Sequence, residues 1–134
     1  MERMTASEYR RRMDKPKTNK YKVAPKPDRT WVGEYRGRKQ TIVFGSKAEM
    51  ERFEHLKWKQ EIGVVSHLML QESFPIGIKK RVYRADFSYF DERDKKWVIE
   101  DVKGKETDVF KIKWDAIDTL YPEIELRKIK KRHD

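Results

Sequence analysis

Three side chains in two β-rich segments have the types and spacing that metal-assisted phosphate chemistry needs. Asp86 lies within RVYRADFSYF, and Asp101 and Lys103 lie at the end of KWVIEDVKG. Two carboxylates that converge repel each other unless a cation lies between them. Oxygen ligands suit Mg²⁺ or Mn²⁺, hard cations that keep several waters for a phosphate substrate. Lys103 would point into the same pocket, where its ammonium would orient the attacking water and offset charge in the transition state.

The Asp-x-Lys pattern occurs twice in the sequence, so its context decides which copy is of interest. Asp94 and Lys96 lie in a charged turn, whereas Asp101 follows the apolar WVI and lies shortly before a glycine. A glycine there lets the backbone turn sharply or approach a ligand closely. The alternative for Asp101 and Lys103 is a structural ion pair at a strand end. The alternative for Asp86 is an ordinary solvent-facing strand residue.

The helices and flanking strands that must hold these side chains follow from hydrophobic periodicity and capping residues. Ser46 precedes a helical pattern that Gly63 ends, and Thr107 can cap a second helix that Pro122 ends. The apolar stripe of the second helix consists of Val109, Ile112, Ala116 and Leu120. The predicted elements are a hairpin of Trp31–Tyr35 and Gln40–Phe44, the helix Lys47–Glu61, the helix after Thr107, and a strand Ile124–Ile129.

Three β-rich segments between the two helices predict an antiparallel meander. They are VVSHLMLQ, RVYRADFSYF and KWVIEDVKG. In the second segment, strict alternation assigns one set of residues to the core and the other set to the opposite face. The core-facing set is Tyr83, Ala85, Phe87 and Tyr89, and the opposite set is Arg84, Asp86 and Ser88. In the third segment, Asp101 and Lys103 share one side and Glu100 lies on the other.

These elements predict one mixed α/β (α+β) domain, with a sheet flanked by helices and the order α-β-β-β-α-β behind an N-terminal hairpin. We assign residues 30–134 to this domain and residues 1–29 to a basic arm. The chain has 134 residues and 37% hydrophobic content, which is enough for one modest core. A two-domain enzyme is therefore excluded.

Charge and composition restrict the classes of function. The formal net charge is +10, so the expected partner is a polyanion such as nucleic acid, with an acidic membrane surface as the weaker alternative. The absence of cysteine excludes thiolate metal sites and cysteine nucleophiles. The three histidines lack paired spacing, and no nucleotide-binding glycine motif is present. Since no segment has the character of a signal peptide or a membrane span, we expect a cytoplasmic protein without membrane contact.

Most of the net positive charge lies in the first forty residues, which hold 13 Lys and Arg against 5 Asp and Glu. Thr5 and Glu8 form a capping-box pattern for a short helix, and the segment from Lys15 to Arg29 should be an extended tether. Tyr9 and Tyr21 interleave with the cations, a mixture that can stack on bases and neutralise phosphates. We expect DNA contacts from Arg10, Arg11, Arg12, Lys20 and Lys22. The alternative is a solvating tail.

The segments SKAEMERF, LMLQESF, YRADFSYF and IEDVKGKET resemble the PD-(D/E)xK nuclease superfamily, from Ser46 to about Leu126. Within it they are similar to small phage-encoded endonucleases related to Holliday-junction resolvases. The resemblance implies a restriction-endonuclease-like core, with Asp86 and Asp101 as metal-binding acids and Lys103 as the lysine of the motif. The proline-aspartate pair that names the superfamily is Ala-Asp in this sequence, at positions 85 and 86.

The same resemblance implies further site residues. Glu49 matches the acid that the first helix often supplies, although Ser46 and Glu49 also form a capping box that needs no metal. Gln71 matches a polar position near the site, and a backbone hydrogen bond is the alternative role for it. The residues expected to contact phosphate are Lys105, Lys111 and Lys113, for which exposed helical lysines are the simpler interpretation.

The resemblance also implies a function, which we state as an expectation. The chain would be a Mg²⁺- or Mn²⁺-dependent endonuclease that hydrolyses DNA phosphodiester bonds, with branched DNA such as a Holliday junction as the first substrate to test. Such substrates require two active sites, so a symmetric homodimer is expected. If the chain is phage- or prophage-encoded, the compartment is the cytoplasm of the host cell. The alternative is a non-catalytic nucleic-acid-binding protein, or a phage replication or packaging accessory protein that retains the nuclease fold.

Overall fold

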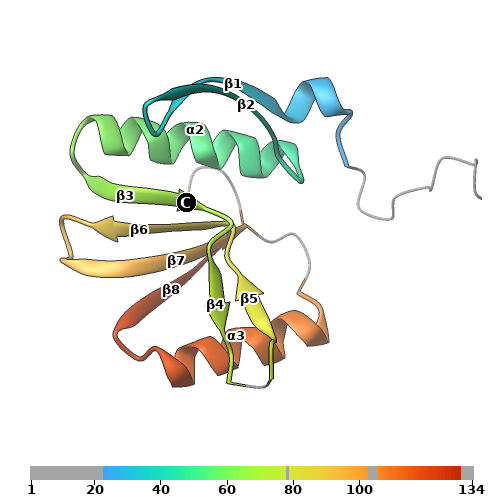
Figure 1. Ribbon diagram of the computed structural model, residues 1–134, viewed down its shortest axis with the longest axis vertical. Coiled ribbons are helices and arrows are strands. Elements are labelled where there is room, and N and C mark those ends of the chain that lie inside the picture. The colour runs from blue at the N-terminus through green and yellow to red at the C-terminus, as the bar shows by residue number, and fades with distance from the viewer. Residues whose placement is uncertain (1–22, 78, 103–105, 131–134) are drawn as a thin grey trace, which may run out of the picture.

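A four-stranded sheet forms the centre of the mixed α/β fold, with one long helix on each face (Figure 1). The computed structural model describes residues 23–77, 79–102 and 106–130. The strands of this sheet are β3 (Val65–Leu70), β6 (Phe87–Asp91), β7 (Lys96–Val102) and β8 (Ile124–Ile129), in that spatial order. The first three are antiparallel neighbours, and β8 joins β7 in parallel. The predicted meander and the predicted last strand are therefore confirmed.

Helix α2 (Lys47–Glu61) covers one face of the sheet and has the predicted bounds. Ser46 accepts a hydrogen bond from the amide of Glu49, and Gly63 follows with φ of 81°, a conformation that costs little only for glycine. Phe53, completely buried, lies at the centre of the first core cluster and packs against Phe87 of the sheet. The apolar side of this helix therefore packs on the sheet, as the helical spacing of its apolar residues predicted.

The hairpin of β1 (Thr30–Tyr35) and β2 (Arg38–Val43) lies over α2. Trp31 packs edge-on against Phe53 with the ring centroids 4.8 Å apart. Gly33 permits this packing, because a Cβ atom there would lie 2.6 Å from the Trp31 ring. Tyr35 donates a hydrogen bond of 2.9 Å to the carbonyl oxygen of Leu68 in β3. The hairpin is therefore attached to both the helix and the edge of the sheet.

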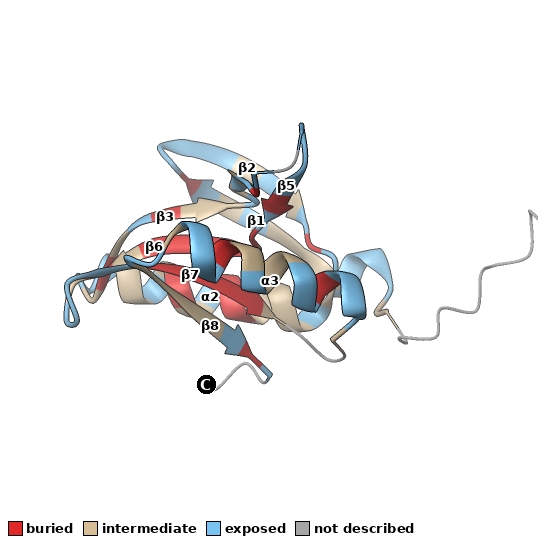
Figure 2. Cartoon of the chain, turned by 90° about the horizontal axis from the view of Figure 1, so that it is seen from below, coloured by how far each residue is buried: buried red, intermediate tan, exposed pale blue. Residues whose placement is uncertain are grey.

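Helix α3 (Asp108–Leu120) covers the other face and begins, as predicted, at Thr107, which accepts a hydrogen bond from the amide of Phe110. The predicted apolar stripe is wrong, because Val109 and Ile112 are 62% and 68% exposed. The buried side of α3 instead carries Phe110 and Ile117, with Trp114 packed beside them. Aromatic rings bury more apolar area than Val or Ala, so the aromatic stripe is the one that faces the sheet. Figure 2 shows the outer side of α3 as exposed and the middle of β6 and β7 as buried.

The segment RVYRADFSYF is not one strand, contrary to the prediction. It divides into β5 (Val82–Arg84), which pairs with β4 (Ser73–Pro75), and β6 of the central sheet. Tyr83 and Ala85 belong to the core cluster beside α3, whereas Phe87 and Tyr89 belong to the cluster beneath α2. All four are buried as expected, but the chain changes faces of the sheet between Ala85 and Phe87. The small β4–β5 hairpin was not predicted.

The basic arm lies partly outside the described residues, and this holds for the helix proposed around Arg10, Arg11 and Arg12 and for Lys20 and Lys22. The tether prediction is wrong at its end, because Lys26–Arg29 forms a short 3₁₀ helix. The Arg29 guanidinium donates hydrogen bonds to the carbonyl oxygens of Ala24 and Phe44, at 3.0 and 2.6 Å, and so ties this turn to the hairpin. Neither α2 nor α3 combines the length and the apolar character that crossing a membrane requires.

Candidate functional site

Asp86 and Asp101 lie side by side at the ends of β6 and β7. The antiparallel register pairs Phe87 with Glu100, so the residue before Phe87 lies opposite the residue after Glu100. Asp86 Oδ2 accepts a hydrogen bond of 2.8 Å from the Val102 amide, which holds its carboxyl group against the end of β7. Asp101 is only 2% exposed. The structure therefore brings together the two acids that the sequence singled out.

The environment of Asp86 favours its protonated form. Burial is the largest cause, followed by a shared hydrogen bond with Asp101 and by the negative charges of Asp101 and Glu49. The Val102 amide acts in the opposite direction, because it stabilises the ionised carboxylate. Together these effects raise the pKa of Asp86 to about 8. A carboxyl group that holds its proton at neutral pH beside a second acid is typical of a site that a cation would complete.

Tyr83 is a member of this site that the sequence analysis did not identify. Its hydroxyl group donates a hydrogen bond to Asp101 Oδ2, and its ring packs against Trp114 of α3. Burial and the carboxylates of Asp101 and Asp86 raise the pKa of Tyr83 far above its usual value, so the hydroxyl keeps its proton and acts as a donor. Tyr83 thus fixes the orientation of Asp101. Sequence spacing gives no sign of this contact, because it joins two different sheets.

A buried ion pair joins the elements that carry the acids. Arg52 of α2 donates from Nε and from one terminal nitrogen to the two carboxylate oxygens of Glu100, the latter at 2.9 Å, and neither side chain is more than 3% exposed. Tyr89 donates a further hydrogen bond to Glu100. Since Arg52 lies one helical turn after Glu49, and Glu100 precedes Asp101, the pair fixes α2 relative to β7. Glu100 faces away from the acids as predicted, but its ion pair with Arg52 was missed.

Glu49 lies near the two aspartates without joining them in a three-ligand group. Its carboxylate accepts a hydrogen bond from the Gly45 amide at 3.3 Å, and its charge contributes to the raised pKa of Asp86. In the ranges 23–77, 79–102 and 106–130, no three Asp, Glu, His or Cys side chains are grouped closely enough to hold a metal ion. The Ser46 half of the predicted capping box is confirmed, but the Glu49 carboxylate accepts from the amide of Gly45, the residue before the cap, and the role of Glu49 as a metal ligand stays a prediction.

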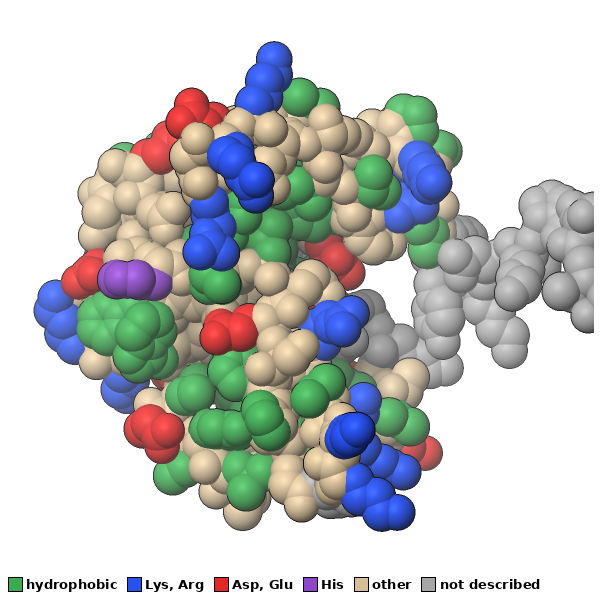
Figure 3. All heavy atoms as spheres, viewed as in Figure 1, with side chains coloured by type: hydrophobic (Ala, Val, Ile, Leu, Met, Phe, Trp, Pro, Cys, Tyr) green, Lys and Arg blue, Asp and Glu red, His purple; other side chains and the backbone are tan. Residues whose placement is uncertain are grey.

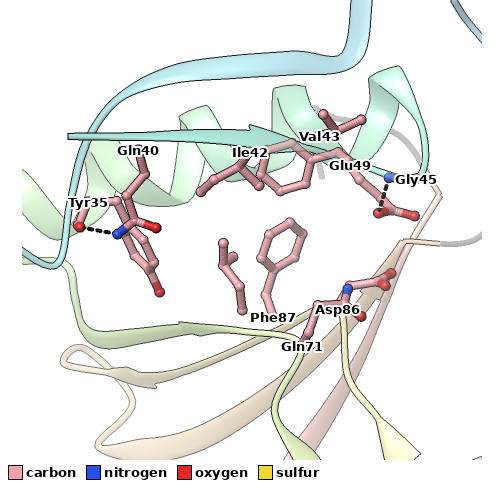
Figure 4. Close-up of a pocket in the computed structure, with 11 residues that line it drawn as sticks. Tyr35, Gln40, Ile42, Val43, Gly45, Glu49, Gln71, Asp86 and Phe87 are labelled. Atoms are coloured by element: carbon pink, nitrogen blue, oxygen red, sulfur yellow. Dashed lines mark hydrogen bonds between the residues drawn. The ribbon is translucent and has the colours of Figure 1, made fainter. Parts of the chain in front are cut away.

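An open cleft of about 630 Å³ lies directly beside the acids, between the β1–β2 hairpin and the edge of the central sheet. Glu49, Gln71 and Asp86 lie at one end of it, and Tyr35 and Gln40 lie at the other (Figure 4). Gln71 has a positive φ of 54°, and its backbone N–H donates a hydrogen bond of 3.2 Å to the backbone carbonyl oxygen of Asp86. Gln71 therefore lies near Asp86, and its role in DNA contact stays a prediction.

The donor set of the site fits a hard divalent cation. Mg²⁺ is commonly held by one or two carboxylates with its remaining positions filled by water and substrate phosphate, and Asp86 and Asp101 supply such a pair. Both oxygens of Asp101 are enclosed by protein, since Oδ1 is buried and Oδ2 accepts a hydrogen bond from the Tyr83 hydroxyl group. These oxygens offer no soft ligand, which disfavours a thiophilic metal.

The lysines predicted at the site are only partly described. Lys103 and Lys105 lie outside the described residues, so their predicted roles stay predictions. Lys111 is exposed on the first part of α3, and Lys113 is half-buried on the same helix. Trp31 packs against Phe53 at the margin of the first core cluster.

The backbone before Asp86 would not accept the proline that the resemblance to the PD-(D/E)xK superfamily implies at position 85. The Ala85 amide donates a hydrogen bond of 3.0 Å to the carbonyl oxygen of Glu72, which links the start of β6 to the end of β3. Proline has no amide hydrogen and would lose this bond. Ala85 is also completely buried, so the site has no room for a larger side chain without repacking.

Comparisons with known proteins give one finding. A family model described as "Protein of unknown function (DUF1064)" matches residues 33–133, a range that includes both aspartates, the cleft and both long helices. Neither the curated proteins nor the solved structures gave a significant match.

Proposed function

The chain belongs to the DUF1064 family, and from its site we propose that it is a metal-dependent endonuclease that hydrolyses phosphodiester bonds in branched DNA. The observation that carries the proposal is the placement of Asp86, half-buried at the end of an open cleft, next to the buried carboxyl group of Asp101. A purely binding protein gains nothing from two converging acids beside a phosphate backbone, because both repel it. The net charge of +10 supports a polyanionic substrate.

Asp86 and Asp101 would hold Mg²⁺ or Mn²⁺. A divalent cation bound there lowers the pKa of a water molecule and offsets the charge that develops on the phosphate. Asp86 must release the proton that its raised pKa retains, and the Val102 amide then stabilises the carboxylate. Tyr83 keeps Asp101 oriented throughout, since its own hydroxyl stays protonated. Lys103, two residues after Asp101, would orient the attacking water or stabilise the phosphate.

The test is cleavage of a labelled four-way junction, and of a matched linear duplex, with Mg²⁺ and with EDTA. Wild-type protein should cut the junction only with Mg²⁺. Asp101→Asn and Lys103→Ala should each lower the rate by about 100-fold or more. DNA affinity, measured in EDTA, should change by less than about 3-fold for either variant, because the basic residues that bind phosphate are intact.

The second Asp-x-Lys copy provides matched controls. Asp94, in the turn between β6 and β7, and Lys96, the first residue of β7, are both exposed and have the same spacing as Asp101 and Lys103. Asp94→Asn and Lys96→Ala should cut like the wild type. Cutting that survives EDTA, or unchanged rates in the Asp101 and Lys103 variants, contradicts the proposal. DNA binding without cutting by any form would favour the non-catalytic nucleic-acid-binding alternative.

A further inference from the structure

The cleft beside the acids extends well beyond the space that a metal ion and a phosphate need. From the end with Asp86 and Glu49 it continues along β2 to Gln40 and Tyr35. Gln40 lies four residue steps before Phe44, which corresponds to about 13 Å of extended chain. The volume of about 630 Å³ is within the range of small-molecule sites. The space-filling view shows this face hollowed beneath the hairpin, with hydrophobic side chains inside the hollow (Figure 3).

The walls of the cleft are apolar with an amide group toward each end. Ile42 of the hairpin and Leu70 of β3, both half-buried, line the cleft together with Phe87 of β6. Gln40 donates from Nε2 to the carbonyl oxygen of Tyr35 at 2.6 Å, which fixes the side chain and leaves its oxygen as an acceptor toward the cleft. Gln71 brings a second amide beside Asp86.

The lining also lacks the groups that a second phosphate would need. Among the described residues that line the cleft, none is Lys or Arg, and both carboxylates lie at one end. A phosphate or a free sugar would leave the apolar walls of Ile42 and Leu70 in contact with water. A flat heteroaromatic ring fills such a space and presents donors and acceptors to the amides at its edges.

We infer that this cleft is a binding pocket for a nucleobase of the substrate strand, close to the phosphate that is cut. The inference rests on the proposed function for the position of that phosphate, since Asp86, which lies beside Asp101, lines one end of the cleft. A base can enter only if it is unpaired and unstacked, which is cheapest at a branch point, a flap or a single-stranded end. The pocket therefore selects DNA with an unpaired nucleotide next to the scissile bond.

The experiment compares two 15-nucleotide probes of equal length and charge, oligo(dT) and an oligonucleotide of abasic phosphates, by fluorescence anisotropy in EDTA. Because both probes carry the same phosphates, their affinity ratio isolates the contribution of the bases. Wild-type protein should bind oligo(dT) about 10-fold more tightly, as expected for a contact of roughly 1–3 kcal/mol per base. Ile42→Trp, which fills the cleft, should bring this ratio close to 1 and leave the affinity for the abasic probe unchanged.

Two further variants make the result independent of any folding defect. Gln40→Ala removes the amide without adding volume and should also lower the ratio. Thr41→Ala changes the neighbouring residue of β2, which is exposed on the opposite face, and should keep the wild-type ratio. Equal affinity of the wild type for both probes, or a preference that survives both cleft variants, overturns the inference. Because the probes are tested without metal, absence of cutting in the junction assay contradicts the proposed function and leaves this result unaffected.

Discussion

At the scale of single residues, the half-buried position of Asp86 beside Asp101 links protonation to stability. Its pKa is about 8 in the folded protein against an ordinary value of 3.8. Below pH 4 the group is protonated whether the chain is folded or unfolded, so it has no effect. As the pH rises from about 4 to about 8, the unfolded chain loses the proton first, and the folded state therefore becomes less stable.

Asp86→Asn should remove this penalty in the absence of metal. The variant should exceed the wild type in free energy of unfolding by about 1 kcal/mol or more at pH 8, and the difference should shrink at pH 5. Denaturant titrations in EDTA at both pH values measure it. Asp118→Asn, an exposed change on α3, should give no pH-dependent difference. A variant that is less stable than the wild type at pH 8 would contradict the prediction.

Cation binding should have the opposite dependence on pH. Since Asp86 must lose one proton to become a ligand, the affinity for Mn²⁺ should rise about tenfold per pH unit from pH 6 to pH 8 and then level off. Calorimetric titration of wild-type protein at pH 6, 7 and 8 tests this. An affinity that does not change with pH would mean that Asp86 is not a ligand.

Tyr83 should act as a positioning residue for Asp101. Tyr83→Phe removes the hydroxyl donor but keeps the ring that packs against Trp114. We expect Mn²⁺ affinity to fall about 10-fold or more, with a stability loss of about 1 kcal/mol. Tyr121→Phe is the matched control, since its hydroxyl donates to the carbonyl oxygen of Pro75 away from the acids. Equal Mn²⁺ affinity in the two variants would assign Tyr83 a structural role only.

Single residues were predictable where the signal was local. The Ser46 and Thr107 caps follow from residues three positions apart, and the pairing of Asp86 with Asp101 follows from two consecutive strands. The contacts of Arg52 with Glu100 and of Tyr83 with Asp101 join residues 48 and 18 positions apart. Their geometry depends on how the layers pack, so spacing along the chain does not indicate it.

At the scale of secondary-structure elements, the Arg52–Glu100 pair fixes the helix relative to the sheet. Arg52→Met leaves Glu100 as an uncompensated buried charge and should destabilise the protein by about 3–5 kcal/mol. The double variant Arg52→Met with Glu100→Met should recover much of this loss. Thermal and denaturant unfolding measure both. Lys57→Met, which breaks an exposed ion pair on the same helix, should cost less than about 1 kcal/mol. If Arg52→Met destabilised the protein no more than Lys57→Met does, the Arg52–Glu100 pair would not be what fixes the helix relative to the sheet.

The elements show where periodicity stops being informative. Helix α3 carries two apolar stripes, one of aliphatic residues and one with Phe110, Trp114 and Ile117, and the spacing of both is helical. Only the larger area that aromatic rings bury decides between them. Periodicity also fails to show the break between β5 and β6. The buried residues of RVYRADFSYF alternate continuously although the chain changes faces of the sheet, because each face has its own core.

At the scale of the whole molecule, the uneven charge predicts how the protein binds polyanions. Residues 1–22 hold eight Lys and Arg and three acidic residues. Deleting them should weaken DNA binding at about 100 mM salt by 10-fold or more and flatten the dependence of log K on log salt by about 3 units. The deletion should stop before Arg29, which holds the hairpin through Phe44.

The control for this deletion is the full-length chain with the eight Lys and Arg of residues 1–22 changed to Gln. It should bind DNA as weakly as the truncated chain, because charge and not length is responsible. Anisotropy titrations over a range of salt concentrations measure both forms. An unchanged slope in both would support the solvating-tail alternative.

The place where the chain crosses from one face of the sheet to the other also protects the site from a particular error of folding. A β-strand that slips by one residue against its neighbour inverts every side chain it carries. Between Ala85 and Phe87 such a slip would pull apolar residues out of two cores at once, and it would break the bonds of Ala85 to Glu72 and of Asp86 to Val102. A misalignment of the strands next to the two acids therefore costs both apolar burial and two hydrogen bonds.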